Sequence, residues 1–140
     1  MADLYVNLLE KITLGDVDRS VNTIQTISNI SYIDNRIFQL PSGSVTTIFS
    51  LSNNNSAGTF VTSSLKYARI TNQSATLPIK LIVSSSTEAM SYLVSAGSSY
   101  MLSTSEMTGS TTSLTFDDIV SVKAEPSGGA INIEYFIATT

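Results

Sequence analysis

The chain has no cysteine, no histidine and no tryptophan among its 140 residues. Without cysteine it can form no disulfide, and it offers no thiolate nucleophile. Without histidine it lacks the commonest general base and the commonest nitrogen ligand of metal ions. Catalysis by a Ser/His/Asp or a Cys/His arrangement is therefore excluded. We expect a protein that is not an enzyme and that holds no cofactor.

Charged residues are also scarce, at 13% of the chain, which is about half the usual share. The seven basic residues are scattered and the net charge is −4, so we expect no patch that neutralises nucleic-acid phosphates. No apolar run approaches the roughly 18 residues that a membrane span needs. The segment Met1–Tyr5 does not begin a secretory signal, so we expect synthesis in the cytoplasm.

What the chain does contain is a 42% apolar fraction in a background of serine, threonine and asparagine. These small polar residues are poor in helix interiors and suit strand faces and turns. A chain of 140 residues is long enough to bury a self-sufficient core as one domain. The composition therefore predicts an all-β domain.

The clearest strand pattern lies between Leu65 and Val83. Alternate positions of Leu77–Val83 are apolar, which is typical of a strand with one face in a core. Leu65–Thr71 is a second strand-like run, and Asn72–Thr76 is the polar turn between the two. We interpret the pair as a hairpin that needs further strands to be stable in water.

Further strand and turn signals follow from residue 36 onward. The strands that we expect are Arg36–Leu40, Val45–Leu51, Met90–Val94, Tyr100–Leu102, Val120–Ala124 and Ile131–Ile137. Roughly eight to ten short strands at hairpin spacing predict an antiparallel β-sandwich or jelly roll. No repeat of fixed period is present, which disfavours a propeller or a solenoid.

The N-terminal segment follows a less regular pattern. Its apolar residues recur mostly at alternate positions, at Leu4, Val6, Leu8, Ile12 and Leu14. A helix would also place Leu4 and Leu8 on one face, but the β-branched residues and the lack of an N-cap favour an extended arm. Gly15–Ser20 reads as a turn.

From Val21 to Ile33 an isoleucine or valine recurs at every third residue, which fits neither a flat strand nor an ideal helix. The many Thr, Ser and Asn residues disfavour a helix, so we expect an extended segment that lies along a surface. We divide the chain into an extended N-terminal arm, residues 1–32, and a single β-sandwich domain, residues 33–140. Because regular alternation begins only after the arm, the domain is expected to fold without it.

The arm is too apolar to remain in solvent, yet a polar turn separates its first part from the rest of the chain. We therefore expect its apolar residues to pack on a neighbouring subunit by adding a strand to an exposed sheet edge. The predicted interface residues are Leu4, Val6, Leu8, Ile12 and Leu14.

Two acidic pairs, Asp16 with Asp18 and Asp117 with Asp118, are the remaining candidates for chemistry. A glycosidase needs two carboxyl groups roughly 5 to 10 Å apart across a cleft, and calcium needs several oxygen ligands at loop spacing. Both pairs lie at predicted turns or strand entries, where Asp bonds its own backbone. We favour turn chemistry and keep calcium binding as an open alternative.

The tyrosines and the weakly charged surface are the features that indicate what the protein could bind. The six tyrosines are Tyr5, Tyr32, Tyr67, Tyr92, Tyr100 and Tyr135, and their scatter among predicted strands favours packing over a sugar-stacking platform. Weakly charged, hydroxyl-rich faces are easily desolvated, so they suit contact with copies of the same subunit or with a large assembly.

Four segments carry a resemblance to a known family: Arg69–Ser74, Pro78–Val83, Leu93–Tyr100 and Ile133–Ala138. They resemble small β-sandwich virion proteins of tailed bacteriophages, such as capsid decoration or cement proteins and accessory head or tail proteins. The likeness covers roughly residues 33 to 140 and consists of short Ser/Thr-rich strands, an Ile-Thr-Asn strand end and an Ala-Gly-Ser turn. This class shares no signature that would carry over a functional residue.

The resemblance implies a non-enzymatic protein that works as a homo-oligomer in the virion, after synthesis in the host cytoplasm. The first hypothesis is a capsid decoration or cement subunit that binds the major capsid protein, or another virion protein, and stabilises the shell. The alternative is a glycan- or receptor-binding module associated with a phage tail or fibre. A carboxylate glycosidase is a third hypothesis, for which the sequence offers no paired-carboxylate cleft.

Overall fold

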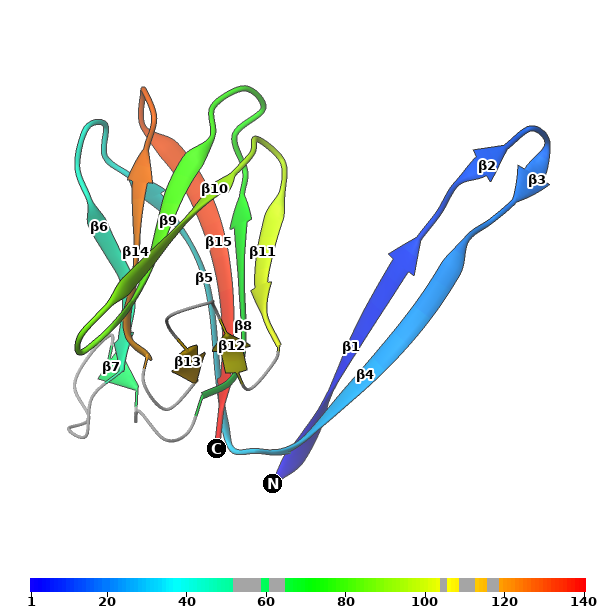
Figure 1. Ribbon diagram of the computed structural model, residues 1–140, viewed down its shortest axis with the longest axis horizontal. Helices are drawn as coiled ribbons and strands as arrows, with labels where there is room; N and C mark the ends of the chain where they lie inside the picture. The colour runs from blue at the N-terminus through cyan, green and yellow to red at the C-terminus, as the bar shows by residue number, and fades with distance from the viewer. Residues whose placement is uncertain (52–58, 61–64, 104–105, 109–112, 116–118) are drawn as a thin grey trace.

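The computed structural model describes residues 1–51, 59–60, 65–103, 106–108, 113–115 and 119–140 (Figure 1). In these residues the secondary structure is all β, and two sheets pack as a sandwich, which confirms the predicted fold class. The described part of the chain has no helix that is long and apolar enough to cross a membrane.

Two sheets make up the body of the protein. One sheet has the order β11 (Ser99–Leu102), β8 (Leu65–Asn72), β15 (Ile131–Thr139) and β5 (Tyr32–Leu40). The other has the order β10 (Ala89–Val94), β9 (Ile79–Ser85), β14 (Ile119–Pro126), β6 (Thr46–Leu51) and β7 (Thr59–Phe60). Neighbouring strands are antiparallel except β6 and β7, which are parallel.

The order of the eight main strands identifies the topology of the body. The three short strands of the body that are not among these eight are β7, β12 (Glu106–Thr108) and β13 (Ser113–Thr115). Of the remaining body strands, counted along the chain, the first, eighth, third and sixth form one sheet, and the second, seventh, fourth and fifth form the other. This interleaved order is that of a jelly roll, which is made of two Greek keys. Of the two predicted alternatives, the body therefore has the jelly-roll topology.

The core lies between the two sheets and follows from the period of two along each strand. Its fully buried side chains include Leu40, Phe49, Ile70, Ile79, Leu81, Ile133 and Ile137. Tyr135 packs between Phe38 and Phe49, with ring centroids 6.1 and 6.3 Å away. Among the described residues, none before Phe38 takes part in this core.

The predicted hairpin from Leu65 to Val83 is wrong in its pairing. Both runs are strands, but β8 pairs with β11 and β15 in one sheet, whereas β9 pairs with β10 and β14 in the other. The chain between them is an arch that crosses the sandwich. The period of two does not distinguish an arch from a hairpin, because in both cases each strand turns one apolar face to the core.

A buried asparagine holds this arch in place. The side-chain nitrogen of Asn72 donates to the carbonyl oxygens of Leu77 at 2.8 Å and of Val94 and Ser95 at 3.2 Å each. Its side-chain oxygen accepts a bond from the backbone nitrogen of Ser74 at 2.9 Å. Since Val94 and Ser95 begin the next arch, one fully buried side chain ties two adjacent crossings together.

The N-terminal arm is a two-stranded hairpin that projects from the base of the body (Figure 1). β1 (Ala2–Glu10) pairs with β4 (Val21–Ile30), and β2 (Thr13–Leu14) pairs with β3 (Val17–Asp18) beside the turn. Gly15 and Asp16 have φ values of 59° and 61°, as a two-residue hairpin turn of type I′ requires. Residues 21–30 of the segment with a period of three are thus the second strand of the hairpin, and residues 32–33 begin β5 of the body. Independent folding of the body stays a prediction.

Candidate functional site

The base of the hairpin packs on the outer face of the four-stranded sheet. Ile30, Tyr67 and Ala138 are buried together there, with Leu4, Val6, Ile27 and Phe136 packed against them. The rings of Tyr67 and Phe136 meet edge to face, with centroids 6.1 Å apart. Burial raises the pKa of the Tyr67 hydroxyl. This small second cluster joins the hairpin to the body.

Backbone geometry also fixes the base. Asn29 has a φ of 66°, and the register between β1 and β4 shifts beside it, so a bulge bends β4 toward the body. The next residue but one, Ser31, donates its backbone N–H to the carbonyl oxygen of Thr139 at 2.9 Å. Gln25 adds a side-chain bond to the carbonyl oxygen of Ser103 at 3.3 Å. The hairpin is therefore tied to the body at its base.

Beyond this base the hairpin exposes apolar side chains on both faces. The exposed members are Tyr5, Leu8, Leu9, Ile12, Leu14, Val17, Val21 and Ile24. Cross-strand pairing places Leu8 on the face that looks toward the body, and Leu9 and Ile24 on the opposite face. A two-stranded hairpin is at best marginally stable in water. An apolar hairpin without cover is therefore the most unusual surface of the described chain.

The five predicted interface residues divide into two groups. Leu4 and Val6 are half-buried and pack on the body of their own chain. Leu8, Ile12 and Leu14 are 42%, 53% and 63% exposed. The alternation that marked the arm does not reveal the outward face of the hairpin, because Tyr5, Leu9 and Ile24 fall outside it. Ile24, which belongs to the segment with a period of three, was the one residue of that face that the sequence pattern had marked as apolar.

A groove of about 450 Å³ separates β1 from the outer face of the four-stranded sheet. The strand contributes every residue from Leu4 to Leu8. The opposite wall is made of Tyr67, Arg69, Ser99, Met101 and Phe136. Since residues of both faces of β1 line the groove, it runs along the free edge of the strand. The groove is largely apolar, with polar groups in its wall.

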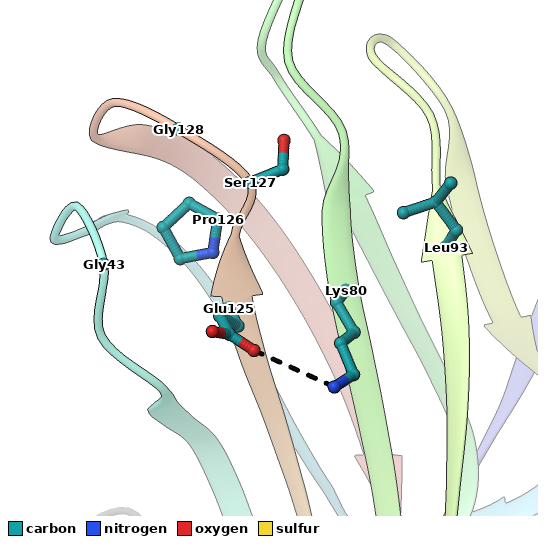
Figure 2. Close-up of a pocket in the computed structure, with 7 residues that line it drawn as sticks. All are labelled: Gly43, Lys80, Leu93, Glu125, Pro126, Ser127 and Gly128. Atoms are coloured by element: carbon teal, nitrogen blue, oxygen red, sulfur yellow. Dashed lines mark ion pairs between the residues drawn. The ribbon is translucent and has the colours of Figure 1, made fainter.

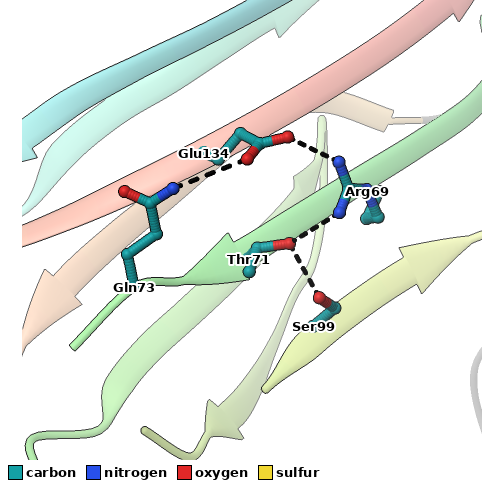
Figure 3. A network of polar contacts seen from close by, with 5 residues as sticks. All are labelled: Arg69, Thr71, Gln73, Ser99 and Glu134. Carbon is teal, nitrogen blue, oxygen red and sulfur yellow. Dashed lines mark hydrogen bonds and ion pairs between the residues drawn. The ribbon is translucent and has the colours of Figure 1, made fainter. Parts of the chain in front are cut away.

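The polar groups of the wall form one network (Figure 3). Arg69 Nη2 lies 2.6 Å from Glu134 Oε1, and Arg69 Nη1 donates to the hydroxyl of Thr71 at 3.2 Å. The hydroxyls of Thr71 and Ser99 are 2.7 Å apart, and Gln73 Nε2 lies 3.5 Å from Glu134 Oε2. Because the two charges pair with each other, the wall offers no unbalanced charge to a partner.

A second depression, of about 540 Å³, lies where the β5–β6 and β14–β15 arches approach β9 and β10 (Figure 2). Its two charged groups, Lys80 and Glu125, form an ion pair of 3.9 Å. The hydroxyl of Ser127 donates to the carbonyl oxygen of Pro78 at 2.9 Å, so it is used to hold an arch. No nucleophile adjoins a base among the residues that line this depression.

Of the two acidic pairs, the one at the tip of the hairpin includes an aspartate that stabilises a turn. Asp18 Oδ1 accepts bonds from the hydroxyl and the backbone nitrogen of Ser20, at 2.5 and 2.9 Å. These two bonds lower the pKa of Asp18, as expected of an aspartate that stabilises a turn. Asp117 and Asp118 lie outside the described residues. The described residues include no group of three or more side chains that could hold a metal ion.

The tyrosines do not form a common platform. Tyr67 and Tyr135 are buried, and Tyr92 and Tyr100 pack against the core with ring centroids 4.6 Å apart. Burial, with the neighbouring tyrosine second, raises the pKa of Tyr100. The two exposed tyrosines lie apart, one on the hairpin and one at the start of β5. Four of the six therefore serve packing.

Comparison of the chain with protein-family models, with curated proteins and with solved structures found no match. Functional inference therefore depends on the hairpin, the groove beside it and the chemistry of their residues.

Proposed function

We propose that this protein is a non-enzymatic structural subunit of a virus particle, most concretely a capsid decoration or cement protein that reinforces the shell as an oligomer. The observation that carries the proposal is the projecting hairpin, with apolar side chains exposed on both of its faces. Such a surface is stable only when something covers it, so the hairpin is the contact element and the jelly roll is its carrier.

The chemistry of the hairpin supports an assembly role. Residues 4–9 and 21–33 carry no charged side chain. Exposed sheet edges are normally protected by lysine, proline or other blocking residues, and these two stretches have neither lysine nor proline. Burying a leucine or isoleucine side chain contributes roughly 1.5 to 3 kcal/mol before the costs of ordering. Several such side chains on one hairpin are enough to decide whether subunits associate.

The fold supports the proposal by analogy alone. Jelly rolls recur in viral capsid proteins and in lectins, so the topology fits both the capsid hypothesis and the glycan-binding alternative. No observation favours the second, because most tyrosines pack in the structure and the groove wall is built from a closed polar network. The capsid role accounts for the hairpin, whereas glycan binding leaves it without a purpose.

The test is to locate the chain in virus particles purified from its source. We expect mass spectrometry to find it at a fixed ratio to the major capsid protein, and cryo-electron microscopy to show its jelly roll outside the shell. Absence of the chain from purified particles would overturn the proposal.

A binding assay with matched variants then asks whether the hairpin is responsible. Leu9→Asp changes an exposed hairpin residue and should leave the fold intact while abolishing co-sedimentation with particles. Leu93→Asp, on a similarly exposed leucine of β10, is the control and should co-sediment like the natural chain. Val6→Asp is unsuitable, because that side chain packs against the chain's own second cluster.

A further inference from the structure

We propose that the groove beside β1 is occupied by β1 of a second copy of this chain, so that two hairpins join edge to edge into one four-stranded sheet with two-fold symmetry. The inference deepens the proposed function and rests on it, since it names the first partner of the same hairpin.

The free edge of β1 is the first argument. β1 pairs with β4 alone among the described strands, so the backbone N–H and C=O groups of its other edge have no strand partner. The groove, of about 450 Å³, runs along this edge beside Leu4–Leu8. The free edge of β4 borders a smaller hollow, of about 350 Å³, which the side chain of Gln25 crosses to bond the carbonyl oxygen of Ser103. A strand that enters the groove therefore pairs with β1.

The sequence of β1 is self-complementary in one register. Two-fold antiparallel pairing centred on Asn7 places Val6 opposite Leu8 of the second copy, and Tyr5 opposite Leu9. The same register places Asp3 opposite Lys11 of the second copy, and symmetry repeats this opposite-charge pair. A shift by two residues in either direction places Lys11 opposite Met1 or Tyr5 of the second copy, so both opposite-charge pairs are lost.

The amount of exposed apolar surface is the third argument. Eight apolar side chains of the hairpin are between 42% and 65% exposed. At roughly 100 Å² each they expose about 800 Å² of apolar surface, and a second hairpin at the edge of β1 covers the part of it that lies beside that edge. The uncharged stretches on both strands mean that a second copy brings no like charges against the first.

Cysteine variants provide the decisive test, because the natural chain has no cysteine and each variant therefore has a single thiol. Asn7→Cys puts that thiol at the two-fold axis, where antiparallel partners lie within the Cα distance that a disulfide needs. The matched control is Asn22→Cys, which lies on the same face of the hairpin and is also exposed. In the proposed sheet the two control residues are three strand spacings, or roughly 14 Å, apart across the sheet and also offset by four residues along it, so a disulfide cannot bridge them.

We expect sedimentation velocity to show a dimer of the natural chain without any other protein. Under mild oxidation, Asn7→Cys should cross-link at least tenfold faster than Asn22→Cys. A natural chain that stays monomeric at all concentrations would overturn the proposal. So would a dimer in which the two variants cross-link at the same rate.

A charge exchange tests the register. Asp3→Lys should weaken the dimer roughly tenfold, because it replaces two attractive pairs with two repulsive ones. The double variant with Asp3→Lys and Lys11→Asp restores opposite charges and should return the dissociation constant to within about threefold of the natural value. Failure of the second exchange to rescue the first would contradict the register. None of these measurements uses particles, so the dimer can fail while particle binding holds, and the reverse.

Discussion

The jelly-roll body and the hairpin are built from the same kinds of residue, yet only the body buries them. In β15 the isoleucines at 131, 133 and 137 are at most 2% exposed, whereas Ile24 of β4 is 61% exposed. β15 pairs on both edges and β4 on one, so both strands are formed and strand pairing alone does not bury their side chains. The body has a second sheet to close over its apolar faces, and the hairpin has cover only at its base. Burial here depends on layers, and strand formation does not guarantee it.

The same substitution in the two regions gives the largest expected contrast. Leu81→Ala removes a fully buried side chain from the core and should lower the free energy of unfolding by about 3 kcal/mol, within a usual range of 2 to 5. Leu9→Ala, on the hairpin, should change it by less than about 0.5 kcal/mol. Urea unfolding followed by circular dichroism at low protein concentration measures both. Equal costs would show that the hairpin belongs to the body's cooperative unit.

The next prediction tests whether Asn72 stabilises the arches of the body. Asn72→Ala leaves buried and partly buried backbone groups of two arches without their partner, and should cost about 2 kcal/mol of unfolding free energy. Asn132→Ala, on the exposed side of β15, is the control and should be close to neutral. The same urea titration compares them. A neutral Asn72→Ala would mean that the arches hold together without this side chain.

Deleting residues 1–30 tests whether the jelly-roll body folds without the hairpin. We expect a cooperative melting transition and a β-type circular dichroism spectrum, because the described core contains no residue before Phe38. The loss of Ile30 uncovers Tyr67 and Ala138 but also removes the cost of ordering the hairpin, so the net change should be roughly 1 kcal/mol. If both the transition and the spectrum disappear, the hairpin is required for the body to fold.

The smallest effect concerns alkaline pH and lies in the body alone. Burial, together with the bond that the Tyr135 hydroxyl donates to Asp34 at 2.6 Å, raises the pKa of Tyr135 from 10.0 to about 12. The unfolded chain therefore ionises first, so this contribution to stability is complete below pH 10 and is lost between pH 10 and 12.

Tyr135→Phe should accordingly flatten the fall of the melting temperature over that range. Part of the fall should remain, because the pKa values of Tyr67 and Tyr100 are also raised. Thermal melts at intervals of half a pH unit measure the slope. A variant whose slope equals that of the natural chain would assign the alkaline loss to other groups.

The sequence predicted the strands well because alternation is a local property. The isoleucines of Ile131–Thr139 alternate inward whether that strand pairs with near or distant neighbours. Pairing is not local, and it was the pairing of Leu65–Asn72 with Ile79–Ser85 that was wrong. Asn72, at the end of the first of these strands, marks the crossing between the sheets by its burial, and the sequence does not show that burial.

The period of three in β4 also has a physical explanation. Ile24 and Ile27 lie three residues apart and therefore on opposite faces of the strand. The bulge beside Asn29 then returns Ile30 to the same face as Ile27, where both join the second cluster. A strand with apolar side chains on both faces and a bulge near its end loses the period of two. This explains why the sequence analysis identified an extended segment but not its hairpin partner.

The arches give the body two ends with different uses. Both chain termini and the base of the hairpin lie at one end, and the β5–β6 and β14–β15 arches lie at the other (Figure 1). Gly43, in the first of these arches, has a φ of 68° and open space around it. A guest peptide inserted there would emerge at the opposite end from a fusion at Thr140. One subunit can thus carry two different peptides at opposite ends of the body, which is the geometry that a display scaffold requires.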